Sequence, residues 1–226
     1  MTAALKHIMK KTLYLLSLLL AVIATSCGGD SQIGKNFNEI EGASSSYRIR
    51  DQKNGEEYQV ITLQTIPNKE YTITSANGKT RTFVDDEPLN LLGVADMTGK
   101  IIVPMEFGKI REMVDGNVLV EMSNRLAGYY YRGIYKNGEI VVEPIYHSLE
   151  IDSNGNGALA TISNDDGRTQ QIYAYDFKNG YKKTLLPLNS LLCSIRDGKI
   201  HIRAHNKSTR RYEDYWFDFS GNEIPE

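Results

Sequence analysis

The sequence predicts an all-β fold, an antiparallel β-meander of repeats of about 40 residues with about four strands each. Three observations predict it. Turn signals recur at nearly even spacing after residue 50, apolar and polar residues alternate between the turns, and a motif returns with the same period in the second half of the chain. Beyond the N-terminal segment no stretch indicates a long helix, and residues 84–92 indicate at most one short turn.

The turns are the most regular of these signals. Asn or Asp stands before a glycine at many points, including Gly55, Gly78, Gly116, Gly138, Gly157, Gly167, Gly180 and Gly198. Asn-Gly and Asp-Gly pairs supply the positive φ angles that tight hairpins need. Between the turns, as in residues 117–122 and 199–205, every second residue is apolar. This alternation is typical of half-buried strands.

The repeating motif consists of a glycine, an Asp and Gly turn, and a proline that follows an aliphatic run. Its clearest copy has Gly93, Asp96, Gly99 and Pro104, and the next has Gly133, Gly138 and Pro144. Less complete copies have Asp176 with Gly180 and Asp218 with Gly221. The Asp and Gly shape a hairpin turn. The aliphatic run forms the returning strand, and the proline is expected to end that strand because it lacks an N–H donor.

This pattern resembles the unit of the WG-repeat family, in which Trp-Gly, Asp and Gly precede an aliphatic strand and a Pro with an aromatic residue. The resemblance covers residues 90–226, with units at 90–129, 130–170 and 171–211, a partial unit at 212–226 and a degenerate copy at 47–65. The Trp position holds Leu92 and Arg132 in the two best copies, and the Gly position holds Tyr173 and Tyr215 in the others.

The repeats bury their apolar faces against neighbouring repeats, so they form either an open twisted array or a small propeller-like ring. The copies differ unevenly from the motif, and no segment is recognisable as a latch between the ends. Both features favour the open array.

The first 26 residues predict a signal peptide. Lys6, Lys10 and Lys11 precede an uncharged run, Thr12 to Ala24, and small residues then lead to Cys27. The run is too short to cross a bilayer comfortably, which takes about 20 residues. Translation from Met1 and translation from Met9 both fit this pattern.

The residues before Cys27 resemble the lipobox of bacterial lipoproteins, with Ala24 at a position where that family has an aliphatic residue. The resemblance implies cleavage before Cys27, acylation of the cysteine and attachment to a lipid bilayer in the cell envelope. Gly28 implies the outer membrane in an organism that has one, and leaves open whether the domain faces the periplasm or the exterior. Residues 27–46 are expected to form a flexible tether, and residues 47–226 the β-repeat domain.

Charge and motifs exclude several functions. The chain has 26 Lys and Arg against 28 Asp and Glu, and cleavage removes three lysines, which leaves a formal charge of −5. This acidity argues against nucleic acid as a partner. No HExxH, GxSxG, P-loop or CxxC motif is present. Residues 152–157 match the first half of an EF-hand loop, but Ser163 replaces its final Glu. We therefore expect no cofactor, no metal and no enzyme activity.

Several residues remain as candidates for a site. Tyr129, Tyr130, Tyr131 and Arg132 form the candidate binding surface, because an exposed aromatic strand face can stack on a sugar or anchor a protein. His201 and His205 share one strand face but lie about 13 Å apart, too far for one metal, and are expected to face solvent beside Arg203. Cys193 is expected to be a small buried hydrophobe, and Trp216 a packing residue.

The sequence thus predicts a non-catalytic binding module for an unidentified envelope protein or glycan. Two alternatives stay open. One is an envelope glycan- or peptide-processing enzyme of unrecognised type, which would need convergent carboxylates or a nucleophile beside a base. The other is a purely structural role in an envelope assembly.

Overall fold

A computed structural model describes residues 32–64, 70–74, 80–84, 90–124, 129–163, 170–188, 190, 192–206 and 208–226. The signal peptide, Cys27 and most of the short turn expected at 84–92 lie outside the described residues. The chain divides into two units, residues 1–32 with 65–89 and residues 33–64 with 90–226. In the first, the described part is the antiparallel pair of β3 (Glu70–Thr74) and β4 (Thr80–Val84).

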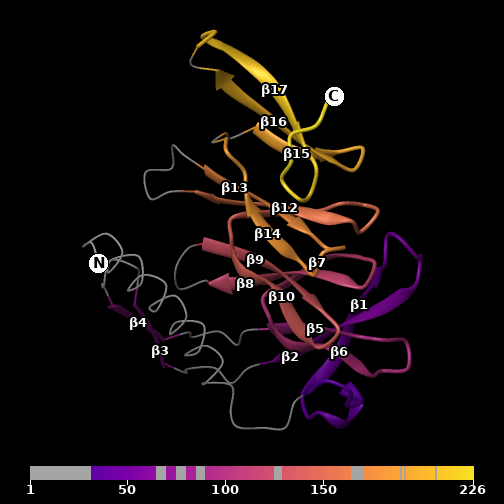
Figure 1. Cartoon of the computed structure of the whole chain (residues 1–226). Coiled ribbons are helices and arrows are strands. Elements are labelled where there is room, and N and C mark those ends of the chain that lie inside the picture. Colours follow the sequence, from indigo (N-terminus) through magenta and orange to yellow (C-terminus); the bar gives the residue numbers. More distant parts are fainter. Residues whose placement is uncertain are drawn as a thin grey trace, which may run out of the picture. The chain divides into compact units, whose positions relative to one another are not determined.

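The second unit contains four antiparallel sheets, which confirms the predicted all-β meander (Figure 1). Sheet 1 has β1 (Ala43–Arg50), β2 (Glu57–Gln64), β5 (Asn90–Ala95) and β6 (Ile101–Phe107). Sheet 2 has β7 (Lys109–Val114), β8 (Asn117–Asn124), β9 (Tyr129–Lys136) and β10 (Glu139–Tyr146). Sheet 3 has β11 (Ser148–Ile151), β12 (Gly157–Ser163), β13 (Gln170–Asp176) and β14 (Lys182–Leu185). Sheet 4 has β15 (Leu192–Arg196), β16 (Lys199–Asn206) and β17 (Arg211–Phe217).

The sheets begin half a repeat away from the units expected from the sequence. The motif turn joins the third and fourth strands of a sheet, as at residues 96–100 between β5 and β6 and at 137–138 between β9 and β10. The expected unit 90–129 therefore takes the last two strands of sheet 1 and the first two of sheet 2. The offset arises because single residues, Gly108 and His147, connect one sheet to the next and give no boundary signal.

The motif turns are held by their own side chains. Asp96 Oδ1 accepts from the N–H groups of Thr98 at 2.8 Å and Lys100 at 3.0 Å. Gly99 has φ +91° and Gly138 has φ +92°, conformations that glycine adopts without strain. The later turns are built alike, around Asp176 with Gly180 at φ +67° and Asp218 with Gly221 at φ +87°.

The motif glycines on β5 and β9 lie against the proline segments of the neighbouring edge strands. A Cβ added at Gly93 would stand 2.5 Å from the carbonyl oxygen of Val103, and one at Gly133 would stand 2.6 Å from that of Val142. Pro104 and Pro144 lie inside β6 and β10, where the strand register shifts, so the expectation that proline ends the strand is wrong. An edge strand with a bulge tolerates proline because the missing N–H faces no partner strand.

The core lies between consecutive sheets, and each interface draws on both neighbours. Val60 and Val94 of sheet 1 pack with Val118 and Val120 of sheet 2. A second cluster joins sheet 2 to sheet 3, and a third joins sheet 3 to sheet 4. Within this unit the sheets follow one another in chain order with sheets 1 and 4 at its two ends, so the repeats form an open array (Figure 1).

The free face of sheet 1 is covered by residues expected to form the tether. A 3-10 turn, Phe37–Glu39, buries Phe37 against Ile61, Ala95, Ile101 and Met105. The expected tether over 27–46 is therefore wrong from Ile33 onward. The residues around Phe37 are small and polar, which is why the sequence indicates a tether. Phe37 itself is apolar and covers the apolar face of the first sheet.

A buried carboxylate joins sheet 1 to sheet 2. Asp51 is fully buried in the turn between β1 and β2. Its carboxylate accepts from the N–H groups of Lys53 and Asn54 in its own turn, and of Asp115 and Gly116 in the turn between β7 and β8, at 2.7–3.3 Å. Burial alone would raise the pKa of Asp51, but these four hydrogen bonds hold it below the ordinary value of 3.8.

We predict that Asp51→Ala lowers the free energy of unfolding by about 3 kcal/mol, because four N–H groups lose a charged acceptor. Urea unfolding followed by circular dichroism measures this. Glu57→Ala, which removes an exposed ion pair with Arg48, is the control and costs about 0.5 kcal/mol or less. Since the folded pKa of Asp51 is the lower one, its contribution is present above about pH 4 and is lost as the pH falls through the folded pKa. Equal losses for the two variants at neutral pH would contradict the prediction.

Candidate functional site

The outer face of sheet 4 carries the candidate site. Along β16 every second side chain points to sheet 3, where Ile200, Ile202 and Ala204 are buried. The alternate side chains point away from sheet 3, as do those of β15 and β17 that pair with them. This outward set comprises Leu192, Ser194 and Arg196 on β15, Lys199, His201, Arg203 and His205 on β16, and Tyr212, Asp214 and Trp216 on β17.

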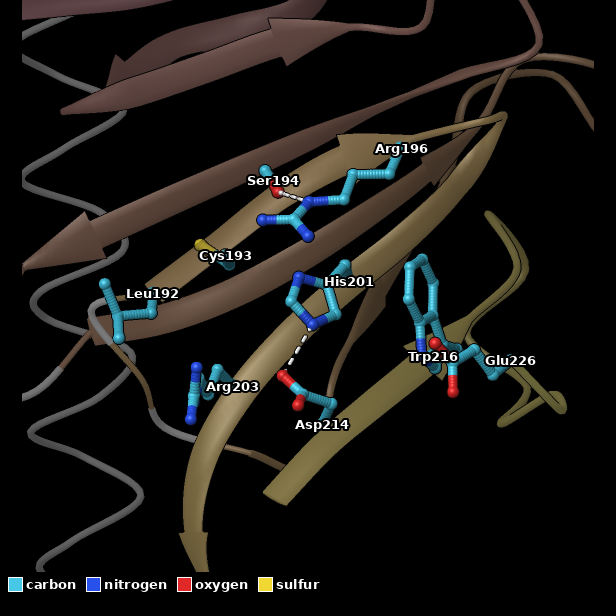
Figure 2. A pocket seen from close by; sticks show the side chains of 9 residues that line it. All are labelled: Leu192, Cys193, Ser194, Arg196, His201, Arg203, Asp214, Trp216 and Glu226. Carbon is cyan, nitrogen blue, oxygen red and sulfur yellow. Dashed lines mark hydrogen bonds and ion pairs between the residues drawn. The ribbon is translucent and has the colours of Figure 1, made fainter. Parts of the chain in front are cut away.

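Strand register brings the groups together. His201 stands opposite Ser194 on one side and Trp216 on the other. Arg203 stands opposite Asp214. These residues and their neighbours line a groove of about 540 Å³, whose lining is drawn in Figure 2: Leu192, Cys193, Ser194, Arg196, His201, Arg203, Asp214, Trp216 and Glu226.

His201 is the central group of the groove. Its Nε2 lies 2.8 Å from Asp214 Oδ1, and its ring centroid lies 4.6 Å from that of Trp216 at an interplanar angle of 36°. Only 7% of the residue is exposed. The expectation that His201 faces solvent is therefore wrong, although it holds for His205, which is exposed beside Tyr212. His201 is covered by partners 13 and 15 residues away in the chain, which only the register of β17 reveals.

Positive charge gathers at one side of the groove. Arg196 Nε donates to Ser194 Oγ at 3.3 Å, and the side chain of Arg203 lies beside the His201–Asp214 pair (Figure 2). Within the described part of the chain, neither arginine forms an ion pair with a carboxylate. Glu226 lies on the far side, next to Trp216 (Figure 2). The groove thus presents two guanidinium groups without an ion-pair partner among the described residues, next to an aromatic pair.

The candidate surface at Tyr129, Tyr130, Tyr131 and Arg132 is not a single face. The side chains of Tyr129 and Tyr130 lie outside the described residues. Tyr131 and Arg132 are neighbours on β9 and so point to opposite faces of sheet 2. The ring of Tyr131 lies 5.5 Å from that of His147. The surface expected from the tyrosine run therefore stays a prediction, because two of its four side chains lie outside the described residues.

Arg132 belongs instead to an ion cluster around Glu121, whose side chain is 2% exposed. Arg111 Nη2 lies 2.6 Å from Glu121 Oε2, and Arg132 Nε lies 3.5 Å from the same oxygen. A carboxylate this deeply buried needs such compensation, since an unpaired buried charge is strongly destabilising. The ion pairs of Arg132 thus have a structural explanation.

The other singled-out groups also have structural roles. Burial, together with the charge of Glu150, raises the pKa of the Cys193 thiol to about 11, as suits a small partly buried hydrophobe. Asp152 is buried and accepts from the side-chain amide of Asn156 at 2.8 Å, which makes the loop an ordinary polar turn. Among the described residues no three His, Cys, Asp or Glu gather as a metal site, and no helix there is long and apolar enough to span a bilayer.

Comparison with known proteins identifies part of the chain. The family model described as WG containing repeat matches residues 93–125. These residues run from β5 to β8, so the matched unit straddles sheets 1 and 2. No curated protein and no solved structure matches the chain. A WG-type β-repeat is therefore present, and the matched family is a repeat module, not an enzyme family.

Trp216 is the single tryptophan of the chain, so its fluorescence reports on the groove. We predict that the ratio of iodide to caesium quenching is about twofold higher for Trp216 than for free N-acetyltryptophanamide at low ionic strength, because Arg196 and Arg203 attract the anion. The double variant Arg196→Gln, Arg203→Gln removes this preference. Arg211→Gln, on the same sheet but its other face, is the control and keeps it. A ratio at or below that of the free compound would contradict the local positive charge.

Proposed function

We propose that this chain is a lipid-anchored envelope protein whose WG-type β-repeat domain is a non-catalytic binding module for an envelope protein or glycan. One observation carries the binding role, namely the outer face of sheet 4 with its groove, on which no other sheet of the described unit packs. The other faces of the four sheets pack against a neighbouring sheet or, for sheet 1, against Phe37. The sheet 4 face instead gathers arginines, a tryptophan and a buried histidine, His201, in contact with the half-exposed Asp214.

The anchor is supported by the order of basic, apolar and small residues before Cys27. If Cys27 is acylated, the fold limits how far the domain can lie from the lipid. The packed domain begins at Ile33, so six residues at about 3.5 Å each keep that point within about 20 Å of an acylated Cys27. Ile33 packs at sheet 1, whereas the groove lies on sheet 4 at the other end of the array. The proposed binding face is thus at the end of the domain farthest from the lipid. The lipid itself would lie in the outer membrane if the organism has one.

A hydrolase is the second candidate, because Ser194, His201 and Asp214 share the groove. Nucleophilic catalysis needs a hydroxyl within hydrogen-bond reach of its base. Ser194 Oγ instead accepts from Arg196 Nε, and no hydrogen bond joins it to His201 in the described part of the chain. The His201–Asp214 pair therefore supports recognition better than acyl transfer.

We predict that the expressed protein incorporates labelled palmitate and partitions with membranes, because acyl chains on Cys27 hold it there. Cys27→Ala is expected to lose both the label and the membrane fraction. Cys193→Ala is the matched control, since it removes the other cysteine and leaves the anchor. Membrane partitioning of the Cys27→Ala protein at the level of the unaltered chain would end the proposal of lipid anchoring.

We predict that the Cys27→Ala protein, free of the lipid contribution, co-sediments with isolated cell envelopes in a saturable manner. Adding Trp216→Ala is expected to weaken this binding about tenfold, because aromatic anchors dominate such surfaces. Tyr212→Ala is the control, since Tyr212 is an exposed aromatic residue on the same face but outside the groove. Absence of saturable binding would sink the proposed function, and equal weakening by both variants would sink the assignment to the groove.

A further inference from the structure

We infer that the groove on sheet 4 takes an acidic sugar, a pyranose that carries a carboxylate, from an envelope polysaccharide. This inference rests on the proposed binding function and names its ligand class. It follows from the two arginines on one side of the groove, from the Trp216 ring on the other side and from the polar character of the lining.

The arginine side of the groove calls for an anion. Arg196 and Arg203 are exposed, and neither is neutralised by a carboxylate in the described residues. Two acids line the groove as well: Asp214 is held by His201 Nε2 at 2.8 Å, and Glu226 lies on the side away from the arginines, next to Trp216 (Figure 2). A guanidinium binds a planar carboxylate through two parallel N–H donors, in a geometry that an ammonium group cannot reproduce. The arginine side of the groove therefore suits a ligand carboxylate.

The other side of the groove suits a sugar ring. Trp216 is partly exposed, and its position is fixed by the His201 ring at 4.6 Å and by Lys199 Nζ at 5.9 Å from its centroid. An aromatic side chain with a fixed orientation offers an apolar body to a pyranose at little cost in conformational entropy. Asp214 keeps a second carboxylate oxygen that can accept from ring hydroxyls, because the His201 contact uses Oδ1 alone.

The lining distinguishes a sugar from a peptide. Many peptide sites use apolar grooves or main-chain pairing along a strand edge. Here the groove opens on the face of sheet 4 and not along an edge, and Leu192 and Cys193 are its only aliphatic or thiol members. Its volume of about 540 Å³ lies within the range of about 300–1,000 Å³ for small-ligand sites. The groove thus fits one or two sugar units better than a peptide side chain.

The test titrates the Cys27→Ala protein with tetragalacturonate and with a hyaluronan tetrasaccharide, following Trp216 fluorescence and calorimetry. Each ligand is paired with its methyl ester, which keeps the rings and removes the charge. We expect at least one acid to bind, its ester to bind at least tenfold more weakly, and Arg196→Gln or Arg203→Gln to weaken the acid by about tenfold. Arg211→Gln leaves binding unchanged, and circular dichroism verifies that each variant is folded.

The outcomes separate this inference from the proposed function. Equal affinity for acid and ester, or equal weakening by Arg211→Gln, overturns the assignment to an acidic sugar. Failure of both acids to bind a protein that still co-sediments with envelopes also overturns it, and leaves the binding module in place. If envelope binding is absent as well, the proposed function falls together with the inference.

Discussion

The first three sheets of the array have apolar side chains on both faces, so each of them is stable only where both faces are covered. The interior sheets meet this constraint through their neighbours, as in the cluster that joins Val60 and Val94 to Val118 and Val120. At the first sheet Phe37 supplies the missing cover. At the last sheet no described segment does so, and the outward positions are polar or aromatic instead. The proposed binding face thus lies on the last sheet, where no further repeat follows among the described residues.

The contacts made by the turns and the glycines explain which motif residues recur in all copies of the repeat and which do not. Asp51 binds the N–H groups of Asp115 and Gly116 in the next sheet, so turn geometry also fixes the spacing between sheets. Gly93 and Gly133 are needed where a proline-containing edge strand bulges over them. In sheet 3 the fourth strand pairs in regular register, and sheet 4 has three described strands. Neither sheet therefore has a bulged edge strand over the motif position, and tyrosine takes the place of the glycine in both. The motif is lost where its contact is absent.

The fold could be predicted because its signals are local. Asn-Gly turns and two-residue alternation act within about ten residues, and they specify strands and meander together. The groove could not be predicted, because the partners of His201 lie on β17 and are brought beside it by the pairing of β16 with β17. His201 and Trp216 each look ordinary alone, while the tyrosine run before Arg132 looks distinctive, although two of its side chains lie outside the described residues. Phe37 was likewise hidden among small polar residues whose composition indicates a tether.

The same alternation separates stability from recognition in sheet 4. Ile200, Ile202 and Phe217 hold the sheet against sheet 3, and they alternate with His201, Arg203 and Trp216, which form the groove. A substitution on the outward set therefore leaves the inward contacts in place, since successive side chains of a strand point to opposite faces. His201 is the exception, because it is buried and its ring supports Trp216. Substitutions at Arg196 and Arg203 can thus change the charge of the groove while His201 and Asp214 keep its shape. A terminal repeat can in this way acquire a ligand without losing its fold.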